Sequence, residues 1–81
     1  MILTKLEFFE KWKHVISSNI KRVRYDEPKQ QMEVTFMSGG QYLYSNVPRI
    51  VYEDLITAPS VGSQFYWNIR DNDAYPFIKI K

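Results

Sequence analysis

The fold is decided by one stretch, Met32-Glu33-Val34-Thr35-Phe36-Met37-Ser38-Gly39-Gly40-Gln41-Tyr42-Leu43-Tyr44. Apolar side chains at Met32, Val34 and Phe36 alternate with polar ones, which is the period of a half-buried strand. The Gly39-Gly40 pair then predicts a hairpin turn, because glycine accepts a positive φ without steric cost. A further strand follows over residues 41–45. The stretch therefore predicts an antiparallel hairpin with one face covered by the rest of the chain.

A third strand is predicted before this hairpin, beginning at Ile20. Asp26-Glu27-Pro28-Lys29 has the composition of a turn, in which Pro28 supplies a fixed φ. We therefore expect a three-stranded antiparallel meander from Ile20 to Tyr44.

Two helices are predicted after the meander. Pro48 marks the start of the first, because proline is favoured in a first helical turn, and Ala58-Pro59 marks its end. Ser60 is the expected cap of a second helix that runs to about Arg70. Residues 75–80 are rich in apolar side chains and predict a short closing strand.

The amino-terminal region favours a helix over residues 4–14. Thr4 and Glu7 match a capping box, in which each side chain satisfies the other residue's free backbone N–H. A strand is the alternative, because residues 3–8 partly alternate. The expected fold is thus a single α+β domain over residues 1–81. It has an amino-terminal extension (1–15) and a core (16–76), in which a three-stranded antiparallel meander is packed by two carboxy-terminal helices.

Composition limits the classes of protein to consider. The chain has 81 residues, 16% of them aromatic, and a net charge of +2. It has no cysteine, which excludes disulfides and thiolate chemistry and suits a reducing cytoplasm. No apolar run approaches the length of about 20 residues that spans a bilayer, and the first residues lack the order of a signal peptide. We therefore expect a cytoplasmic protein without a membrane partner.

Catalytic and metal-binding chemistry has little support in the sequence. His14 is the only histidine. A nucleophile–histidine–acid site would need an orienting acid beside it, and a zinc site would need three or four ligands, for which no second histidine and no cysteine exist. Gly39-Gly40 lacks the Lys-Ser/Thr ending of a phosphate-binding loop. The acidic pairs Glu53-Asp54, Asp26-Glu27 and Asp71 with Asp73 fall on predicted helix faces or turns. We expect no catalytic residues, no metal and no cofactor, and hence a protein that binds a partner.

The strand register suggests where that partner binds. A four-residue loop at 26–29 pairs Val23 with Met32 and Arg22 with Glu33. Val23 and Tyr25 then lie on the apolar side that the helices cover, whereas Arg22 and Arg24 lie on the face away from the helices. A two-residue turn at Gly39-Gly40 then moves Leu43 into the core and sets Tyr42 and Tyr44 beside the two arginines. A three-residue loop has the opposite effect and buries both tyrosines.

An exposed face of this composition suits single-stranded RNA. Bases stack on tyrosine rings, and guanidinium groups stack or contact phosphates. Lys21 extends the positive charge. The leading hypothesis is an RNA-binding face made of Tyr42, Tyr44, Arg22, Arg24 and Lys21.

The second predicted helix offers a different surface. Phe65 and Ile69 are expected to face inward, which leaves Tyr66, Trp67 and Arg70 on its other sides. These residue types dominate protein–protein hot spots, so a protein-interaction or inhibitor domain is the alternative. Burial of Trp67 near Trp12 would remove that surface. The sequence is also compatible with a homodimer.

In their order, the residues resemble the KTSC family, a short domain named for the carboxy-terminal part of some lysyl-tRNA synthetases. The matching residues are Ser17-Ser18-Asn19-Ile20, Tyr25-Asp26, Val34-Thr35-Phe36 with Gly39-Gly40, Tyr42-Leu43-Tyr44, Val47-Pro48, Val51-Tyr52, Leu55, Ala58, Ser60, Gly62, Phe65 and Ile69. The Tyr-x-Tyr motif of the family corresponds to Tyr42 and Tyr44. Its usual Phe-Asn pair appears as Phe65-Tyr66, so the asparagine is replaced. The resemblance implies small bacterial or phage proteins, for which RNA binding is the suggested role.

Overall fold

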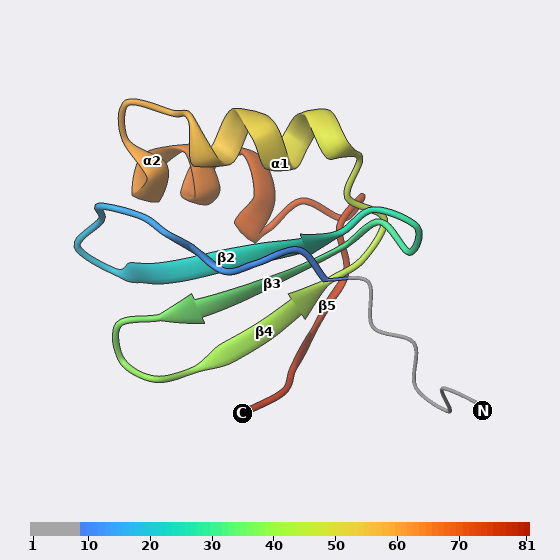
Figure 1. Ribbon diagram of the computed structural model, residues 1–81, viewed down its shortest axis with the longest axis horizontal. Helices are drawn as coiled ribbons and strands as arrows, with labels where there is room; N and C mark the ends of the chain where they lie inside the picture. Colours follow the sequence, from blue (N-terminus) through green and yellow to red (C-terminus); the bar gives the residue numbers. More distant parts are fainter. Residues whose placement is uncertain (1–8) are drawn as a thin grey trace.

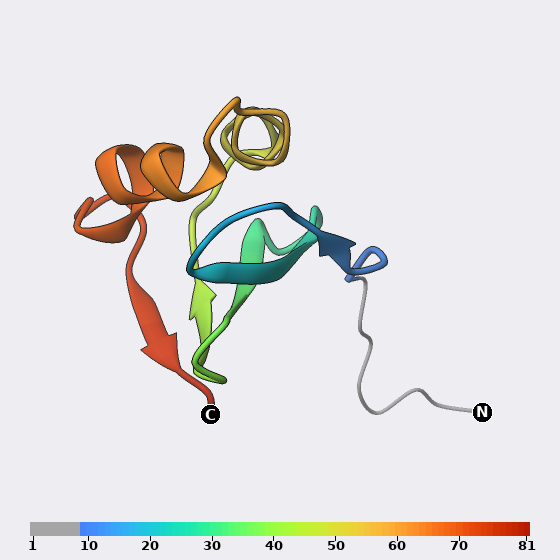
Figure 2. The ribbon, with the colours of Figure 1, turned by 90° about the vertical axis from the view of Figure 1, so that its left-hand side faces the viewer.

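The structure is a computed structural model that describes residues 9–81, and it has two layers (Figure 1). A five-stranded antiparallel sheet forms one layer, with the strands in the order β1-β2-β3-β4-β5. The helical segments lie across one face of this sheet (Figures 1 and 2). The elements are β1 (Lys13–His14), β2 (Ile20–Asp26), β3 (Gln31–Phe36), β4 (Gln41–Tyr44), α1 (Arg49–Ile56), α2 (Val61–Phe65), the π-helix η1 (Tyr66–Arg70) and β5 (Phe77–Lys79).

The predicted α+β class is confirmed, and the predicted meander forms the centre of the sheet. The two carboxy-terminal helices and the closing strand are also present, although η1 continues α2 as a π-helix. Ser60 caps α2 as expected, since its hydroxyl oxygen accepts a hydrogen bond from the Ser63 backbone N–H at 3.3 Å. The sheet extends beyond the three-stranded meander at both edges: the predicted closing strand, β5, pairs with β4, and the unpredicted β1 pairs with β2.

The predicted helix over residues 4–14 is wrong where the structure can be compared with it. Residues 1–8 lie outside the described part of the chain. Beyond them, Phe9 forms a β-bridge with Asp26, and β1 pairs with β2 through Lys13↔Val23 and His14↔Arg22. The free edge of β2 offers backbone groups that need partners, and pairing with them outweighs a modest local helix preference.

The register of β2 and β3 places the predicted apolar residues in the core. Tyr25 pairs with Met32 and Val23 pairs with Val34. All four are fully buried on the side that the helices cover. The pairing differs by two residues from the one predicted, and a shift of two preserves the face of every side chain.

The β3–β4 hairpin has a three-residue loop, so the expectation of a two-residue turn was wrong. The Phe36 N–H donates to the Gly40 carbonyl at 2.8 Å, which leaves residues 37–39 in the loop. Within this loop, only Gly39 has a positive φ, at 102°. A type I′ two-residue turn requires positive φ at both central residues, whereas a three-residue loop requires it at one.

This loop length reverses the predicted faces of β4. Tyr42 pairs with Val34 and Tyr44 pairs with Met32, so both tyrosines lie on the side that the helices cover. Leu43, which was expected in the core, pairs with Glu33 and lies on the other side. We call that other side, opposite the helices, the open face.

Stacked tyrosines join α1 to the sheet. The rings of Tyr25 and Tyr52 are nearly parallel, with centroids 4.9 Å apart. The Tyr25 hydroxyl donates to the Val47 carbonyl just before α1, whereas the buried Tyr52 hydroxyl has no partner among the described residues. The two hydroxyls therefore make different contributions to stability.

Tyr25→Phe should lower the free energy of unfolding by about 1–3 kcal/mol, because it leaves the buried Val47 carbonyl without a donor. Tyr52→Phe is the matched control and should be neutral or stabilising, since it removes an unpartnered buried hydroxyl. Urea unfolding followed by circular dichroism measures both. Equal losses in the two variants would contradict this assignment.

Gly39→Ala should destabilise the protein by about 1–3 kcal/mol, because an alanine at this φ is strained. A Cβ at Gly39 would meet no atom within 4 Å, so the cost is one of backbone conformation alone. Gly40→Ala is the control, because its Cβ would make only an ordinary contact with Tyr42 at 3.4 Å. The prediction fails if Gly40→Ala has the lower thermal midpoint.

Candidate functional site

Five aromatic side chains form a closed cluster at the β4–β5 end of the sheet. Each ring contacts the next at a centroid distance of 5.4–5.5 Å, in the order Phe36, Tyr42, Phe77, Tyr44, Phe65 and back to Phe36. We call this set the aromatic cluster. Tyr44 and Phe65 are buried, Phe36 and Tyr42 are half-buried, and Phe77 is 50% exposed. The cluster therefore presents part of its surface to solvent.

The strand pairing explains how the cluster is assembled. Tyr42 and Tyr44 share one side of β4, and β5 brings Phe77 opposite Tyr44. Phe65 reaches the same place from α2. Figure 2 shows β4 and β5 side by side below the segment formed by α2 and η1.

The exposed side of the cluster is the floor of a groove of about 850 Å³, which we call the aromatic groove. Tyr66, Arg70 and Asp71 line it from the helical side, and Lys79 lines it from β5. Ser18, Asn19, Met37 and Ser38 line its far end. The wall thus carries two basic side chains and one acidic side chain above an aromatic floor.

Burial raises the pKa of the Tyr44 hydroxyl to about 12. Burial is the largest cause of this shift; Tyr42 and Asp71 contribute smaller increases, and the positive charge of Arg70 opposes them. The Tyr44 hydroxyl therefore stays protonated at neutral pH, and it lies within electrostatic range of both charged residues on the helical wall.

The π-helix turns three side chains away from the core. Phe65 and Ile69 are buried as predicted, whereas Tyr66 is 49% and Trp67 is 77% exposed. The Arg70 guanidinium carbon lies 5.2 Å from the centroid of the Tyr66 ring. The expectation that Tyr66, Trp67 and Arg70 lie outside the core is confirmed, and the alternative of a buried Trp67 near Trp12 is wrong.

The arginines predicted for the binding face lie on the open face, as expected, but Trp12 occupies the space between them. The guanidinium carbons of Arg22 and Arg24 lie 4.0 and 4.4 Å from the centroid of the Trp12 ring. Arg24 also forms an ion pair with the buried Glu33 at 2.8 Å. Lys21 is exposed beside them.

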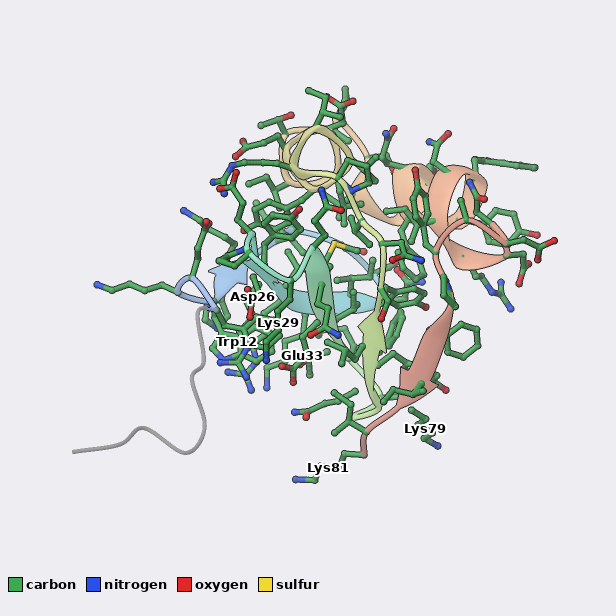
Figure 3. All side chains as sticks on the ribbon, turned by 90° about the vertical axis from the view of Figure 1, so that its right-hand side faces the viewer. Trp12, Asp26, Lys29, Glu33, Lys79 and Lys81 are labelled. Carbon is green, nitrogen blue, oxygen red and sulfur yellow. The ribbon has the colours of Figure 1, made fainter. Side chains whose placement is uncertain are left out.

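The predicted platform of two tyrosines beside two arginines is therefore not assembled. Tyr42 and Tyr44 lie on the helix-covered side, and Arg22 and Arg24 lie on the open face. Figure 3 shows Trp12 and Glu33 near one another and Lys79 well apart, near the opposite edge of the sheet. Phe77 and Lys79 were not predicted to be site residues. They are two residues apart in the predicted closing strand, and the alternation of sides along a strand could have placed them together.

Two of the six acidic residues considered for catalysis, Glu27 and Glu53, form ion pairs with Arg49. Arg49 contacts Glu10 at 2.6 Å, Glu27 at 2.8 Å and Glu53 at 3.1 Å. The contacts with Glu10, and to a smaller extent Glu27, raise the pKa of its guanidinium. Within residues 9–81, no group of three or more histidine, cysteine or acidic side chains is arranged to hold a metal ion. The same residues contain no helix with the length and apolar character needed to cross a membrane.

The sheet, its helical layer and the aromatic groove define a small α+β domain with a groove lined by aromatic and basic side chains. The family model of the KTSC domain matches residues 16–75, so the chain belongs to the KTSC domain family. A crystal structure of a KTSC domain protein from Yersinia pestis has the same fold, with a TM-score of 0.81 and 28% sequence identity. The similarity covers 88% of this chain and 97% of that one.

The curated relatives fall into two groups. A lysine–tRNA ligase from Trichormus variabilis is 40% identical over 58 residues, which cover 72% of this chain but only 10% of the ligase. An uncharacterised protein from Stutzerimonas stutzeri is 36% identical, and the match covers 65% of this chain and 89% of that protein. This chain therefore resembles a whole small protein in one case and about a tenth of a large enzyme in the other.

The two motifs behind the family resemblance meet in the aromatic groove. Tyr42 and Tyr44 come from the Tyr-x-Tyr motif, and Phe65-Tyr66 stands where the family has Phe-Asn. All four residues line the groove. Tyr66, the residue that departs from the family pattern, forms part of its wall.

Stability should fall as the pH rises from about 10 to 12. Tyrosine hydroxyls titrate near pH 10 in an unfolded chain, whereas burial raises the pKa of Tyr44 and Tyr52 to about 12 in the folded chain. The unfolded chain therefore loses these protons first, so stability is complete below pH 10 and decreases above it. Thermal midpoints across this range should fall less steeply in a Tyr44→Phe/Tyr52→Phe variant. An unchanged slope would contradict the prediction.

Proposed function

We propose that this protein is a non-catalytic module that binds single-stranded RNA in the aromatic groove. The observation that carries the proposal is the closed cluster of five aromatic rings at the floor of a groove with Arg70 and Lys79 on its walls. Nucleobases stack on aromatic rings, and this stacking contributes about 1–3 kcal/mol per base with little dependence on sequence. Phosphates linked to such bases would contact the basic walls.

The charge of the groove supports an anionic ligand. In the described part of the chain, neither Arg70 nor Lys79 has a carboxylate within ion-pair distance, whereas Arg24 and Arg49 both do. A cation already paired with a carboxylate loses that partner when it binds phosphate. The two groove cations do not carry this cost.

The relatives favour RNA over DNA. A lysine–tRNA ligase acts on tRNA, and the part of this enzyme that resembles the chain covers only a tenth of it. A separable module of this kind suits a role in holding RNA rather than in the aminoacylation chemistry. The groove is built for unpaired bases, because a base must leave its helical stack to reach an aromatic floor.

Binding should be lost when the groove is altered. Phe77→Ala should weaken binding of a fluorescein-labelled RNA hexamer by about ten-fold, since it removes an exposed stacking ring. Lys79→Gln should weaken binding and reduce the slope of log Kd against log salt by about 0.7, because one phosphate contact is lost. Fluorescence anisotropy at salt concentrations from about 50 to about 200 mM measures both effects.

Lys21→Gln is the matched control for Lys79→Gln. It removes the same charge from an exposed site that does not line the groove. Equal losses from the two substitutions would show that binding follows net charge and would exclude the groove as the site. Wild-type affinity in Phe77→Ala would exclude stacking on the cluster.

A protein partner is the second candidate, and the 77% exposure of Trp67 favours it. Tryptophan, tyrosine and arginine are the residues most enriched at interface hot spots. In this case Tyr66, Trp67 and Arg70 would bind a partner with little salt dependence, and RNA would not compete. The anisotropy measurement separates the two candidates.

A further inference from the structure

A second groove continues from the aromatic groove. It has a volume of about 600 Å³ and lies between residues 16–19, the start of α2 and Trp67, and we call it the Trp67 groove. Ser18, Asn19 and Tyr66 line both grooves. The two grooves are therefore neighbouring parts of one surface, separated by the Tyr66 side chain.

Apolar side chains with high exposure stand beside the Trp67 groove. Trp67 is 77% exposed and Ile16 is fully exposed. The rings of Tyr66 and Trp67 meet edge to face, with centroids 4.9 Å apart and an interplanar angle of 89°. This contact orients the Trp67 ring but leaves much of it open to solvent.

The polar floor of the Trp67 groove is held by a tight turn. The Ser17 hydroxyl oxygen accepts from the N–H groups of Asn19 and Ile20, and the hydroxyl donates to the Asn19 side-chain oxygen at 3.0 Å. Gly62 allows this turn to lie against α2, because a Cβ there would come within 3.1 Å of the Asn19 side-chain oxygen. The Asn19 side-chain NH₂ makes no hydrogen bond among the described residues, so it remains available to an acceptor on a ligand.

A positive charge stands where the two grooves meet. The guanidinium of Arg70 lies over the ring of Tyr66, which is the side chain that divides them. A ligand with two flat aromatic groups joined by an anionic link matches this order of ring, cation and ring. Two consecutive nucleotides have that composition, with a phosphate between two bases.

We infer that the protein binds two consecutive unpaired nucleotides, and this inference rests on the proposed function. The first base stacks on the aromatic cluster at Tyr42 and Phe77. The second base stacks on Trp67, with its edge toward the amide of Asn19. The phosphate between them pairs with Arg70.

Tryptophan fluorescence tests this assignment directly, because stacking of a base on an indole quenches its emission. The chain has two tryptophans, and Trp12 lies on the open face, away from both grooves. An unlabelled uridine hexamer should quench the wild-type protein in a saturable manner. Trp67→Phe, which keeps Trp12, should abolish the quenching.

Affinity for the same hexamer provides the second measurement. Trp67→Ala should raise the Kd by about 5- to 50-fold, because one stacking contact is lost. The exposure of Trp67 means that the fold should survive the substitution, and circular dichroism checks this. Trp12→Phe is the matched control and should leave the Kd unchanged.

The outcomes separate this inference from the proposed function. Suppose that Phe77→Ala weakens binding, whereas Trp67→Ala leaves the Kd unchanged and RNA does not quench the emission of Trp67. The RNA then contacts only the aromatic groove, and the inference is overturned. If the hexamer does not bind at all, the proposed function fails together with it. Quenching by RNA that persists in Trp67→Phe would assign the second contact to Trp12 and would also overturn the inference.

Discussion

The backbone conformation of Gly39 is the constraint on which the site depends. Its φ of 102° allows a three-residue loop between β3 and β4. That loop length sets the register of the hairpin, and the register decides which face of the sheet each β4 side chain occupies. With the other parity, Tyr42 and Tyr44 would leave the aromatic cluster and Leu43 would take their side. A difference of one residue in the length of this loop thus decides which β4 side chains lie on the helix-covered side.

The two faces of the sheet use their aromatic residues differently. On the helix-covered side, aromatic rings contact one another and leave a groove whose walls carry Arg70 and Lys79. On the open face, Trp12 packs against Arg22 and Arg24, and the ion pair of Arg24 with Glu33 further reduces the charge available to a ligand. The carboxylates around Arg49 connect the segment at Glu10 to α1 and to the β2–β3 turn. Among residues 9–81, the two cations of the groove therefore have no carboxylate within ion-pair distance, whereas Arg22 and Arg24 on the open face are held in structural contacts.

Local patterns in the sequence were sufficient for the elements but not for the pairing of β4. The period-two alternation correctly assigned Val23, Met32 and Val34 to the core, and the proline and serine signals correctly bounded the helices. The Gly39-Gly40 pair is compatible with loops of two or three residues, and only the three-dimensional packing of the tyrosines selects between them. The amino-terminal prediction failed for a related reason: the edge of β2 is a partner distant in sequence, which a local helix pattern cannot reveal. The candidate tyrosines were thus predicted on the wrong face, and both line the aromatic groove on the helix-covered side.

The position of β5 gives the groove a property that a rigid pocket lacks. Among the strands of residues 9–81, β5 pairs only with β4, yet it supplies both Phe77 and Lys79. The proposed binding surface is therefore complete only while this short edge strand is docked. Edge segments of this kind open locally at a lower free energy than the centre of a sheet. A ligand bound in the groove, as proposed, would therefore stabilise the docked strand and slow the hydrogen exchange of the β5 amides. Undocking of β5 would remove Phe77 and Lys79 from the groove while the pairing of β1 to β4 is kept.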